Sequence, residues 1–208
     1  MSGYVSEAVI RRLPAYNRHL HELEQEGVLQ ISSQELGERM QLTPSQIRQD
    51  INSFGGEGRQ GFGYQVHELR EHIRKIMGLT QRHRMVIIGA GRIGNAIANY
   101  DGFDHEGFTT VAMFDNDPEK WKQNGKIPVY DVSRMAERLP ELEPDIAVLA
   151  LPASAAQEML NRLYEMGIRA VWNFTPVDLQ YARDVAVVNV HMSDSLQILS
   201  YLMKHQND

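Results

Sequence analysis

The amino-acid sequence predicts an α/β protein: an N-terminal winged-helix domain, a C-terminal Rossmann-like doubly wound parallel sheet, and a final helix. Two short helices with capping residues follow one another closely at residues 32–53. An apolar run ends in a glycine-rich turn at residues 85–94, and strand and helix patterns then alternate as far as residue 189. We expect the chain to divide into residues 1–80, 81–190 and 191–208.

The composition is that of a globular protein and excludes cysteine chemistry. Hydrophobic residues make up 42% of the 208 residues, and no run of about 18 apolar residues occurs. The N-terminus lacks the basic-then-apolar order of a signal peptide, so we expect a soluble, cytoplasmic protein. Because cysteine is absent, there are no disulfides or thiolate zinc sites, and any redox sensitivity must reside in a bound cofactor.

The net charge of −6 is unevenly distributed along the chain. Residues 1–83 carry 10 Lys and Arg against 10 Asp and Glu, so the acidic excess lies entirely in the remaining residues. A neutral N-terminal part can still bind DNA if its cations share one face, but its net charge alone does not predict such binding.

A helix is expected over residues 5–26. Apolar residues recur there at intervals of three and four, namely Val9, Leu13, Tyr16, Leu20 and Leu23. Pro14 should kink this helix or mark a helix start, and Gly27 should end it.

Residues 32–53 predict a helix-turn-helix. Ser32 with Glu35, and Thr43 with Gln46, each match a capping box, and a proline follows Thr43 at the first helical position. In this motif the second helix, residues 44–53, would enter the major groove of DNA. It would present Ser45, Arg48, Gln49 and Asn52 to bases or phosphates, with Ile47 and Ile51 facing inward. The alternative is an αα-hairpin of another small helical domain.

The glycine-rich segment 54–64 favours the helix-turn-helix. It predicts a β-hairpin, and a hairpin in this place is the wing of a winged helix. Arg59 and Gln60 at its tip suit a narrow minor groove, and Tyr64 is a further expected DNA contact. A helix over residues 67–78 should bury Leu69, Ile73 and Ile76, and a polar linker at residues 79–84 leads to the next domain.

Residues 84–100 predict the phosphate-binding turn of a dinucleotide fold. An apolar run at residues 85–88 reads as a buried strand. After it, Gly89 permits a tight turn, Gly91 lets the backbone approach a pyrophosphate, and Gly94 lets the following helix pack closely. The start of that helix offers free N–H groups to phosphates. The alternative is that the glycines merely close a turn.

Asp115 supports the dinucleotide interpretation. It ends a second expected strand, residues 110–114, and lies 21 residues after Gly94, where an acidic side chain can hydrogen-bond ribose hydroxyls. The same carboxylate would repel a 2′-phosphate. We therefore expect NADH and NAD⁺ as cofactors rather than their phosphorylated counterparts.

Alternating strands and helices complete the expected sheet. Strands are predicted at residues 127–130, 145–151, 170–173 and 185–189, with helices at residues 132–139 and 154–167. Carboxyl ends of strands, where such folds bind ligands, carry Leu151, Pro152, Asn173 and Phe174.

The last helix, about residues 193–204, should be capped by Ser193 or Asp194. Its apolar face consists of Leu196, Leu199, Leu202 and Met203, widened by Ile198 and Tyr201. Our hypothesis is that this face packs on a second subunit in a homodimer; the alternative is that it covers the chain's own sheet.

No catalytic chemistry is recognisable, and we expect no catalytic residues and no metal. No histidine spacing is typical of zinc, and there is no nucleophile elbow or Ser–His–Asp arrangement. A dehydrogenase needs a substrate domain, yet residues 1–78 already read as a DNA-binding unit. Two alternatives remain: a small NAD-dependent oxidoreductase with a helical appendage, and a CoA- or nucleotide-binding scaffold without redox sensitivity, which Asp115 disfavours.

Several short motifs together resemble those of one known family. They are Arg12, Leu13, Pro14 and Tyr16, residues 31–37, Gln46, Ile47, Arg48 and Asp50, and residues 54–55, 61–64, 89–94, 114–118, 151–153 and 173–176. Over nearly its whole length the chain is similar to the Rex redox-sensing transcriptional repressors of bacteria. The resemblance implies a homodimer that exchanges C-terminal helices, binds a palindromic operator through two winged helices, and releases it when NADH binds.

Carried over by position, the resemblance also implies site residues. The cofactor would be held by Gly89, Ala90, Gly91, Arg92, Ile93, Gly94, Asp115, Leu151 and Pro152, with Tyr100, Asn173 and Phe174 near the nicotinamide. DNA would meet Arg48 and Gln49 on the second helix of the motif, and Arg59 and Gln60 on the wing.

Two positions depart from the family pattern. The family would place an acidic residue just before the last helix, pairing with Tyr100 in one state and with an arginine such as Arg18 in the other. This chain has His191 there, so either Asp194 substitutes or His191 introduces a pH-sensitive element. Gln49 stands where a basic residue is common, which would remove a phosphate contact.

The difference between the two cofactor forms suggests a switch. The oxidised nicotinamide ring is positively charged, so a dry, apolar pocket favours NADH over NAD⁺ without any catalysis. Closure of that pocket would move the winged helices out of register with their half-sites.

Overall fold

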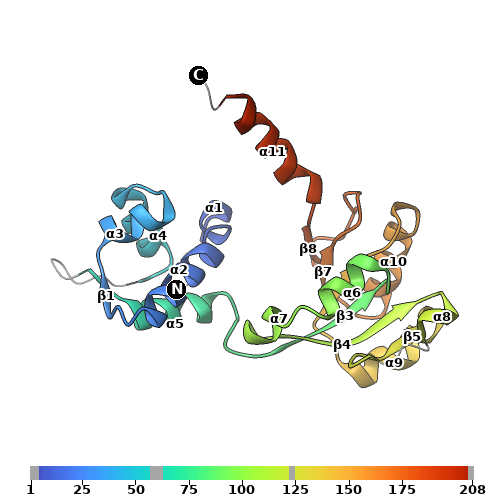
Figure 1. Ribbon diagram of the computed structural model, residues 1–208. Helices are drawn as coiled ribbons and strands as arrows, with labels where there is room; N and C mark the ends of the chain where they lie inside the picture. Colours follow the sequence, from blue (N-terminus) through green and yellow to red (C-terminus); the bar gives the residue numbers. More distant parts are fainter. Residues whose placement is uncertain (1–4, 57–62, 122–124, 206–208) are drawn as a thin grey trace. The chain divides into compact units, whose positions relative to one another are not determined.

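The computed structural model describes residues 5–56, 63–121 and 125–205, which form two units (Figure 1). Unit 1 is Met1–Gln81 and unit 2 is Arg82–Asp208. Each unit encloses hydrophobic clusters of its own.

Unit 1 is helical and contains one short sheet. Its elements are α1 (Glu7–Ile10), α2 (Leu13–Gln25), β1 (Gln30–Ile31), α3 (Ser33–Met40), α4 (Pro44–Ser53), β2 (Tyr64–Gln65) and α5 (Val66–Ile76). Strands β1 and β2 pair antiparallel, with Ile31 opposite Tyr64. The helices share one core, in which Tyr16, Leu36, Ile47 and Ile73 are completely buried.

Two predictions for unit 1 need correction. The helix expected over residues 5–26 is two helices, because the chain breaks at Arg11 and Arg12, and Pro14 lies in the first turn of α2. In α5, Ile76 is exposed, whereas Val66 is buried. Strand β2 pairs with β1, which precedes the helix-turn-helix, and most of the hairpin predicted over residues 54–64 lies outside the described residues.

The two predicted capping boxes differ in the structure. Ser32 and Glu35 bond reciprocally at the start of α3, as predicted. At the start of α4, Thr43 accepts from the N–H of Gln46, but the Gln46 side chain turns away to donate to Asp50. The second capping box is therefore only half formed, because Gln46 serves a buried carboxylate instead.

That carboxylate, Asp50, is the centre of a network that joins α2 to α4. Arg12 donates to it twice, at 2.7 and 2.8 Å, and the Tyr16 hydroxyl donates at 3.0 Å. Burial alone would raise the pKa of this carboxyl group, but the hydrogen bonds from Arg12, Gln46 and Tyr16 outweigh it and lower the pKa below the usual aspartate value. The network holds the second helix of the helix-turn-helix against the start of α2.

Unit 2 is built on a six-stranded sheet. Its elements are β3 (His83–Ile88), α6 (Arg92–Ala98), α7 (Gly102–His105), β4 (Phe108–Asp115), α8 (Pro118–Trp121), β5 (Val129–Asp131), η1 (Val132–Arg134), α9 (Met135–Leu142), β6 (Ile146–Leu149), α10 (Ala153–Glu165), β7 (Ala170–Asn173), β8 (Ala186–Asn189) and α11 (Met192–Lys204). The strand order is β5-β4-β3-β6-β7-β8, and every pairing is parallel. This is the order of a Rossmann-like doubly wound fold.

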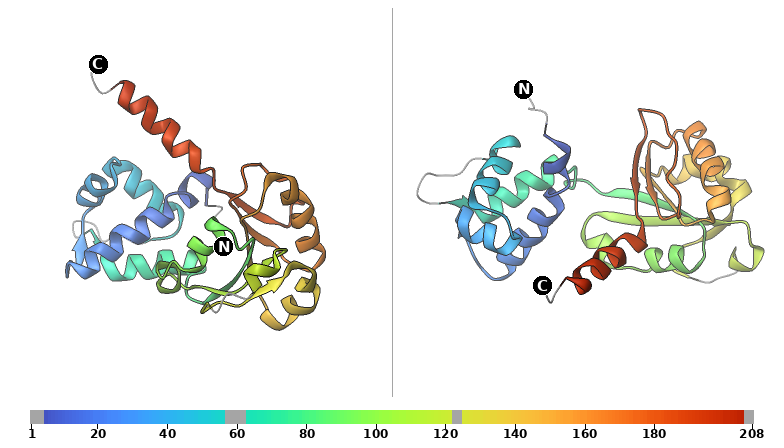
Figure 2. Two further views of the ribbon diagram at one scale, coloured as in Figure 1. Left: turned by 45° about the vertical axis from the view of Figure 1, so that its right-hand side comes forward. Right: turned by 90° about the horizontal axis from the view of Figure 1, so that it is seen from above.

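Helices cover both faces of this sheet (Figure 1; Figure 2). One hydrophobic cluster joins the strands to α9 and α10, and another joins them to α6, α7 and α8. The register places Ile88 of β3 level with Phe114 of β4 and with Leu149 of β6. The next residues of these three strands, Gly89, Asp115 and Ala150, therefore meet at one point on the sheet edge.

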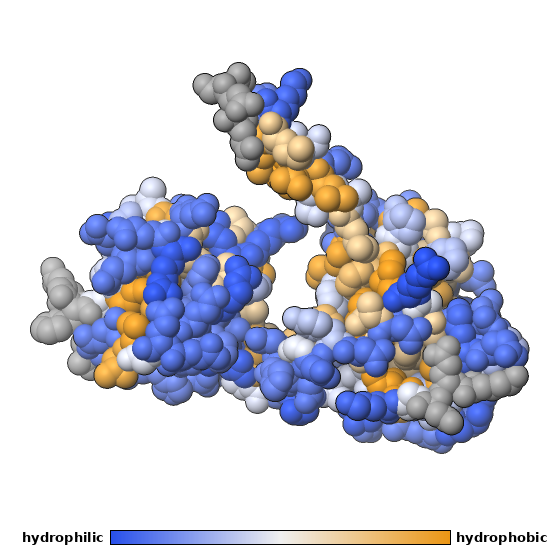
Figure 3. All heavy atoms as spheres, viewed as in Figure 1, coloured by the Kyte–Doolittle hydropathy of each residue, from blue (hydrophilic) through white to orange (hydrophobic). Residues whose placement is uncertain are grey.

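The last helix, α11, buries none of its residues. Its large apolar side chains are 49–66% exposed, from Leu199 at the low end to Leu196 at the high end, and they form a band along the helix in Figure 3. The alternative that this helix covers its own sheet is therefore wrong for this chain.

The start of α11 also differs from expectation. The N-cap residue is His191, with no side-chain capping hydrogen bond, rather than Ser193 or Asp194. The ring Nε2 of His191 lies 3.0 Å from Oδ1 of Asp178, so this histidine already has an acidic neighbour within its own unit.

The Asp50 network leads to a first prediction. Its depressed pKa means that ionised Asp50 stabilises the fold at neutral pH, and that this contribution is lost as the pH falls through the folded-state value. We expect Asp50→Asn to destabilise unit 1 by about 3–5 kcal/mol at pH 7, because Arg12 loses its charged partner. The loss should shrink on acidification, as measured by calorimetric unfolding of the full chain.

Arg11→Gln is the matched control, since it breaks the solvent-exposed ion pair to Glu7. Equal effects of the two substitutions would contradict the role assigned to Asp50.

Candidate dinucleotide cleft and nucleic-acid interface

The glycine-rich turn after β3 has the tight geometry that the sequence predicts. Gly89 has a φ of +105°, and a Cβ at this position would lie 2.3 Å from the carbonyl oxygen of Ala150. A Cβ on Gly94 would lie 1.9 Å from the carbonyl oxygen of Gly89, whereas one on Gly91 would meet nothing within 4 Å. Gly89 and Gly94 therefore have no room for a side chain, whereas Gly91 faces open space.

Hydrogen bonds with two side chains, those of Asp115 and Asn95, hold the loop between these glycines. The N–H of Ala90 donates to Oδ2 of Asp115 at 2.6 Å, and Nδ2 of Asn95 donates to the carbonyl oxygens of Ala90 and Gly91 at 2.7 and 3.0 Å. Ala90 is buried and its N–H is occupied, so it shapes the turn. Helix α6 begins directly after Gly91, and no side chain caps its start, which leaves first-turn N–H groups open to an anion.

Asp115 is 7% exposed, and its carboxylate accepts three hydrogen bonds from the described residues. Besides Ala90, the donors are the N–H of Asp117 at 2.9 Å and Nζ of Lys120 at 3.0 Å. Burial alone would raise the pKa of this carboxyl group, but the hydrogen bonds from Asp117, Lys120 and Ala90 outweigh it and hold the pKa below its usual range. The site therefore presents a fixed carboxylate beside the glycine-rich turn.

These residues border a cleft of about 600 Å³ at the carboxyl edge of the sheet. Its walls include Gly89, Gly91, Asp115, Leu151 and Pro152, all predicted from the sequence. The other predicted cofactor residues do not line this cleft; they are Ala90, Arg92, Ile93, Gly94, Tyr100, Asn173 and Phe174. The strand order reverses between β3 and β6, and the carboxyl edge at such a point is where doubly wound folds bind nucleotides.

An aromatic chain lies elsewhere in unit 2. Tyr100, which is 61% exposed, packs on Phe103, Phe103 on Trp172, and Trp172 on Phe174, with ring centroids 4.7, 5.5 and 4.6 Å apart. Tyr100 and Phe174 are thus the ends of one apolar row.

Asn173, expected near the nicotinamide, is completely buried. Its Nδ2 donates to Asn189 and to the carbonyl of Val177, and its Oδ1 accepts from the N–H and hydroxyl of Thr175. With its amide committed internally, it fixes the turn after β7.

Sequence reasoning missed three charged residues in the cleft wall: Lys120, Glu158 and Arg162. Glu158 and Arg162 lie one turn apart on α10, and Lys120 lies five residues after Asp115. For Lys120, the signal in the sequence was the Asp-Pro step at residues 117–118. A short helix that begins there turns the chain back toward the end of the preceding strand, where Asp115 lies.

The second helix of the helix-turn-helix exposes the predicted DNA-facing residues. Ser45, Arg48, Gln49 and Asn52 are exposed on α4, whereas Ile47 and Ile51 are completely buried, as predicted. Arg48 donates from Nη1 to the hydroxyl of Ser33 at 3.0 Å. One face of α4 is thus polar and accessible, and its arginine is held by the first turn of α3.

Tyr64, a predicted DNA contact, is instead a core residue of unit 1. It is 7% exposed, and burial raises the pKa of its phenol. Its position opposite Ile31 explains this, because both residues face the helices from the short sheet. The wing residues Arg59 and Gln60 lie outside the described residues.

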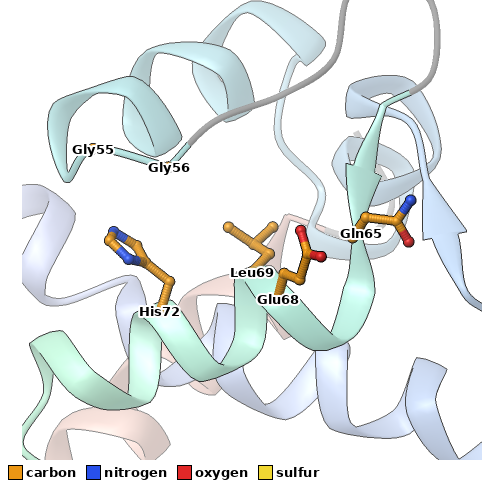
Figure 4. Close-up of a pocket in the computed structure, with 6 residues that line it drawn as sticks. All are labelled: Gly55, Gly56, Gln65, Glu68, Leu69 and His72. Carbon is orange, nitrogen blue, oxygen red and sulfur yellow. The ribbon is translucent and has the colours of Figure 1, made fainter.

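A second cavity, of about 250 Å³, lies in unit 1 beside the turn that follows α4 (Figure 4). Glu68, Leu69 and His72 point toward the turn that carries Gly55 and Gly56, and Gln65 also lines the cavity. The ring Nε2 of His72 lies 2.8 Å from the carbonyl oxygen of Phe54 and fixes this turn. His72 thus holds the first residue of the glycine-rich segment, Phe54, in place.

No metal or membrane feature was found in the described part of the chain. Its His, Asp and Glu side chains form no group of three that could hold a metal ion. None of its helices is both long and apolar enough to cross a lipid bilayer.

Comparison with known proteins finds a matching family model in each part of the chain. Residues 4–52 match the model of a putative DNA-binding protein N-terminus, and residues 80–177 match that of a CoA-binding domain. The redox-sensing transcriptional repressor Rex of Caldanaerobacter subterraneus subsp. tengcongensis is 47% identical over 97% of this chain and 91% of its own length. Rex of Clostridium perfringens is 44% identical over 98% and 96%, respectively.

Solved structures of RSP, a Rex-family repressor, are similar to this chain. The complex with NAD⁺ and operator DNA has a TM-score of 0.91 at 45% identity, covering 98% of this chain and 94% of RSP. The complex with NADH has a TM-score of 0.89 at 44% identity, covering 98% and 96%.

The glycine geometry leads to a second prediction. Gly94→Ala should lower the melting temperature of unit 2, because the new methyl group would collide with the backbone of Gly89. Gly91→Ala should leave the melting temperature unchanged, since its φ of −78° suits alanine and the space is open. Calorimetry of both variants tests this contrast, and a similar melting temperature for both would contradict the packing assigned to Gly94.

Proposed function

Because this chain belongs to the Rex family of redox-sensing transcriptional repressors, we propose that it binds operator DNA and leaves it when NADH binds. The observation that carries the proposal is the similarity, at 44–47% identity, over both units together. RSP has been solved with operator DNA and NAD⁺, and separately with NADH. We propose the same two ligand states for this chain, acting in the cytoplasm where DNA and the cofactor are both available.

In this proposal unit 2 holds the cofactor. The first turn of α6 and Gly91 face the pyrophosphate, and Asp115 accepts a hydrogen bond from the adenosine ribose. Leu151 and Pro152 form the opposite wall of the cleft. A CoA molecule carries a phosphate on this ribose, so the carboxylate of Asp115 favours NADH over CoA despite the match of this unit to a CoA-binding domain.

The nicotinamide end is proposed to lie toward Tyr100 and Phe174. The aromatic row between them offers an apolar surface, and a ring sheltered there from water is more stable uncharged than charged. NADH then binds more tightly than NAD⁺ with no chemical reaction. A difference of this kind shifts the conformational equilibrium only by its own free energy, typically about 1–3 kcal/mol.

Unit 1 is proposed to bind the operator through α4. Ser45, Arg48, Gln49 and Asn52 face outward on one helix, as major-groove contacts must. Arg48 would exchange its bond to Ser33 for a base edge or a phosphate. Because Gln49 is uncharged, affinity depends more heavily on Arg48, supported by Arg59 and Gln60 of the wing.

We further propose that the protein is a homodimer through α11. Its apolar band is exposed along the whole helix, and burying such a surface against a partner is strongly favourable. Two α4 helices related by a two-fold axis would then read the half-sites of a palindromic operator.

The central experiment measures release of labelled DNA by fluorescence polarisation. The probe is a palindromic duplex that the protein itself selects from a random pool. We expect NADH to release it at concentrations where NAD⁺ does not. Equal release by both forms, or by neither, would overturn the sensor function.

A variant separates the two sites. Arg48→Ala should weaken operator binding about 10- to 100-fold while leaving NADH affinity unchanged, because α4 lies in a different unit from the cleft. Arg11→Ala removes the same charge elsewhere in unit 1 and serves as the control. Parallel loss of DNA and NADH binding in Arg48→Ala would contradict separate sites.

The dimer is tested by deleting residues 193–208. Light scattering should show a fall from dimer to monomer mass, while unit 2 keeps its fold, because α11 buries no residue within it. Gln197→Glu, which changes a polar residue on the same helix, should leave the mass unchanged. A truncated protein that remained dimeric would refute the assignment of α11.

A further inference from the structure

Lys120 lies in direct contact with the carboxylate that would recognise the ribose. Its Nζ donates to Oδ2 of Asp115 at 3.0 Å, and its side chain, 29% exposed, forms part of the cleft wall. Rejection of a 2′-phosphate by Asp115 depends on an uncompensated negative charge. An ammonium group at this distance largely cancels that charge.

Asp115 is also held in place by groups other than Lys120. Two backbone N–H groups, from Ala90 and Asp117, donate to its two oxygens independently of the lysine. The ammonium group of Lys120 can therefore move away while each carboxylate oxygen of Asp115 keeps a backbone hydrogen-bond donor. Lys120 belongs to the short helix α8, and its four-carbon stem is flexible enough to reorient within the cleft.

A 2′-phosphate would enter the cleft between these two opposite charges. It would be repelled by Asp115 and attracted by Lys120, and a phosphate offers several strong acceptor oxygens to an ammonium group. The balance of the two interactions, rather than the carboxylate alone, then decides how strongly the phosphorylated cofactor is excluded.

We propose that Lys120 is a specificity-determining residue that weakens the discrimination of the cleft against NADPH relative to NADH. The proposal rests on the proposed function of the cleft as an NADH site. Its physical basis is the contact between Lys120 and the buried Asp115, together with the two backbone donors that hold the same carboxylate.

The test compares dissociation constants for NADH and NADPH, titrated by nicotinamide fluorescence on the full-length protein. We expect Lys120→Gln to raise the ratio of the NADPH constant to the NADH constant about tenfold, the size of one charge-assisted hydrogen bond. Lys120→Arg keeps the charge and should stay near the wild-type ratio. Arg183→Gln removes one exposed positive charge of unit 2 outside the cleft wall and should leave the ratio unchanged.

Three outcomes would overturn the proposal: an unchanged or lower ratio in Lys120→Gln, an equal rise in Arg183→Gln, or a rise in Lys120→Arg as large as in Lys120→Gln. If Lys120→Gln does not fold, Lys120→Met takes its place in the same comparison. A wild-type protein that binds neither cofactor would instead overturn the proposed function, so the two failures are distinguishable.

Discussion

The hydrogen bond from the N–H of Ala90 to the carboxylate of Asp115 is the constraint on which the cleft depends. It joins the turn after β3 to the end of β4, and both strands end level with β6. Because this bond occupies the amide of Ala90, Ala90 is buried in the turn and the next residue, Gly91, lines the cleft. The glycine-rich turn and the carboxylate of Asp115 are thus joined by one interaction, and neither is positioned without the other.

In unit 1 a buried carboxylate, that of Asp50, likewise joins elements that are distant in the sequence. Asp50 draws donors from α2 and α4, so the orientation of the helix that carries Arg48 is set by a charge buried beneath it. Arg12, Tyr16, Gln46 and Asp50 all belong to the motifs that resemble the Rex family. The structure explains their association as a single hydrogen-bonded network that supports the outward-facing residues.

The sequence predicted most of the fold because its signals are local. The strand at residues 170–173, the glycine-rich turn and the reciprocal cap at Ser32 each depend on neighbouring residues, and each was confirmed. The errors arose where distant residues compete. Tyr64 was expected to contact DNA, but it is buried where β2 pairs with β1. Asn173 was expected near the nicotinamide, and no sign in the sequence indicated that Asn189 and Thr175 bond its amide. Lys120 was missed because only the folded turn brings it back to Asp115.

The exposed apolar side chains of α11 would also affect how long the protein persists in a cell. An unpaired chain carries a row of leucine, isoleucine and tyrosine side chains in water, which is the kind of surface that chaperones and proteases recognise. If α11 packs on a second copy, as proposed, the stability of the protein rises with its own abundance. At very low copy number, newly made chains would then be degraded before pairing, which would set a lower limit on the amount of the protein that a cell can maintain.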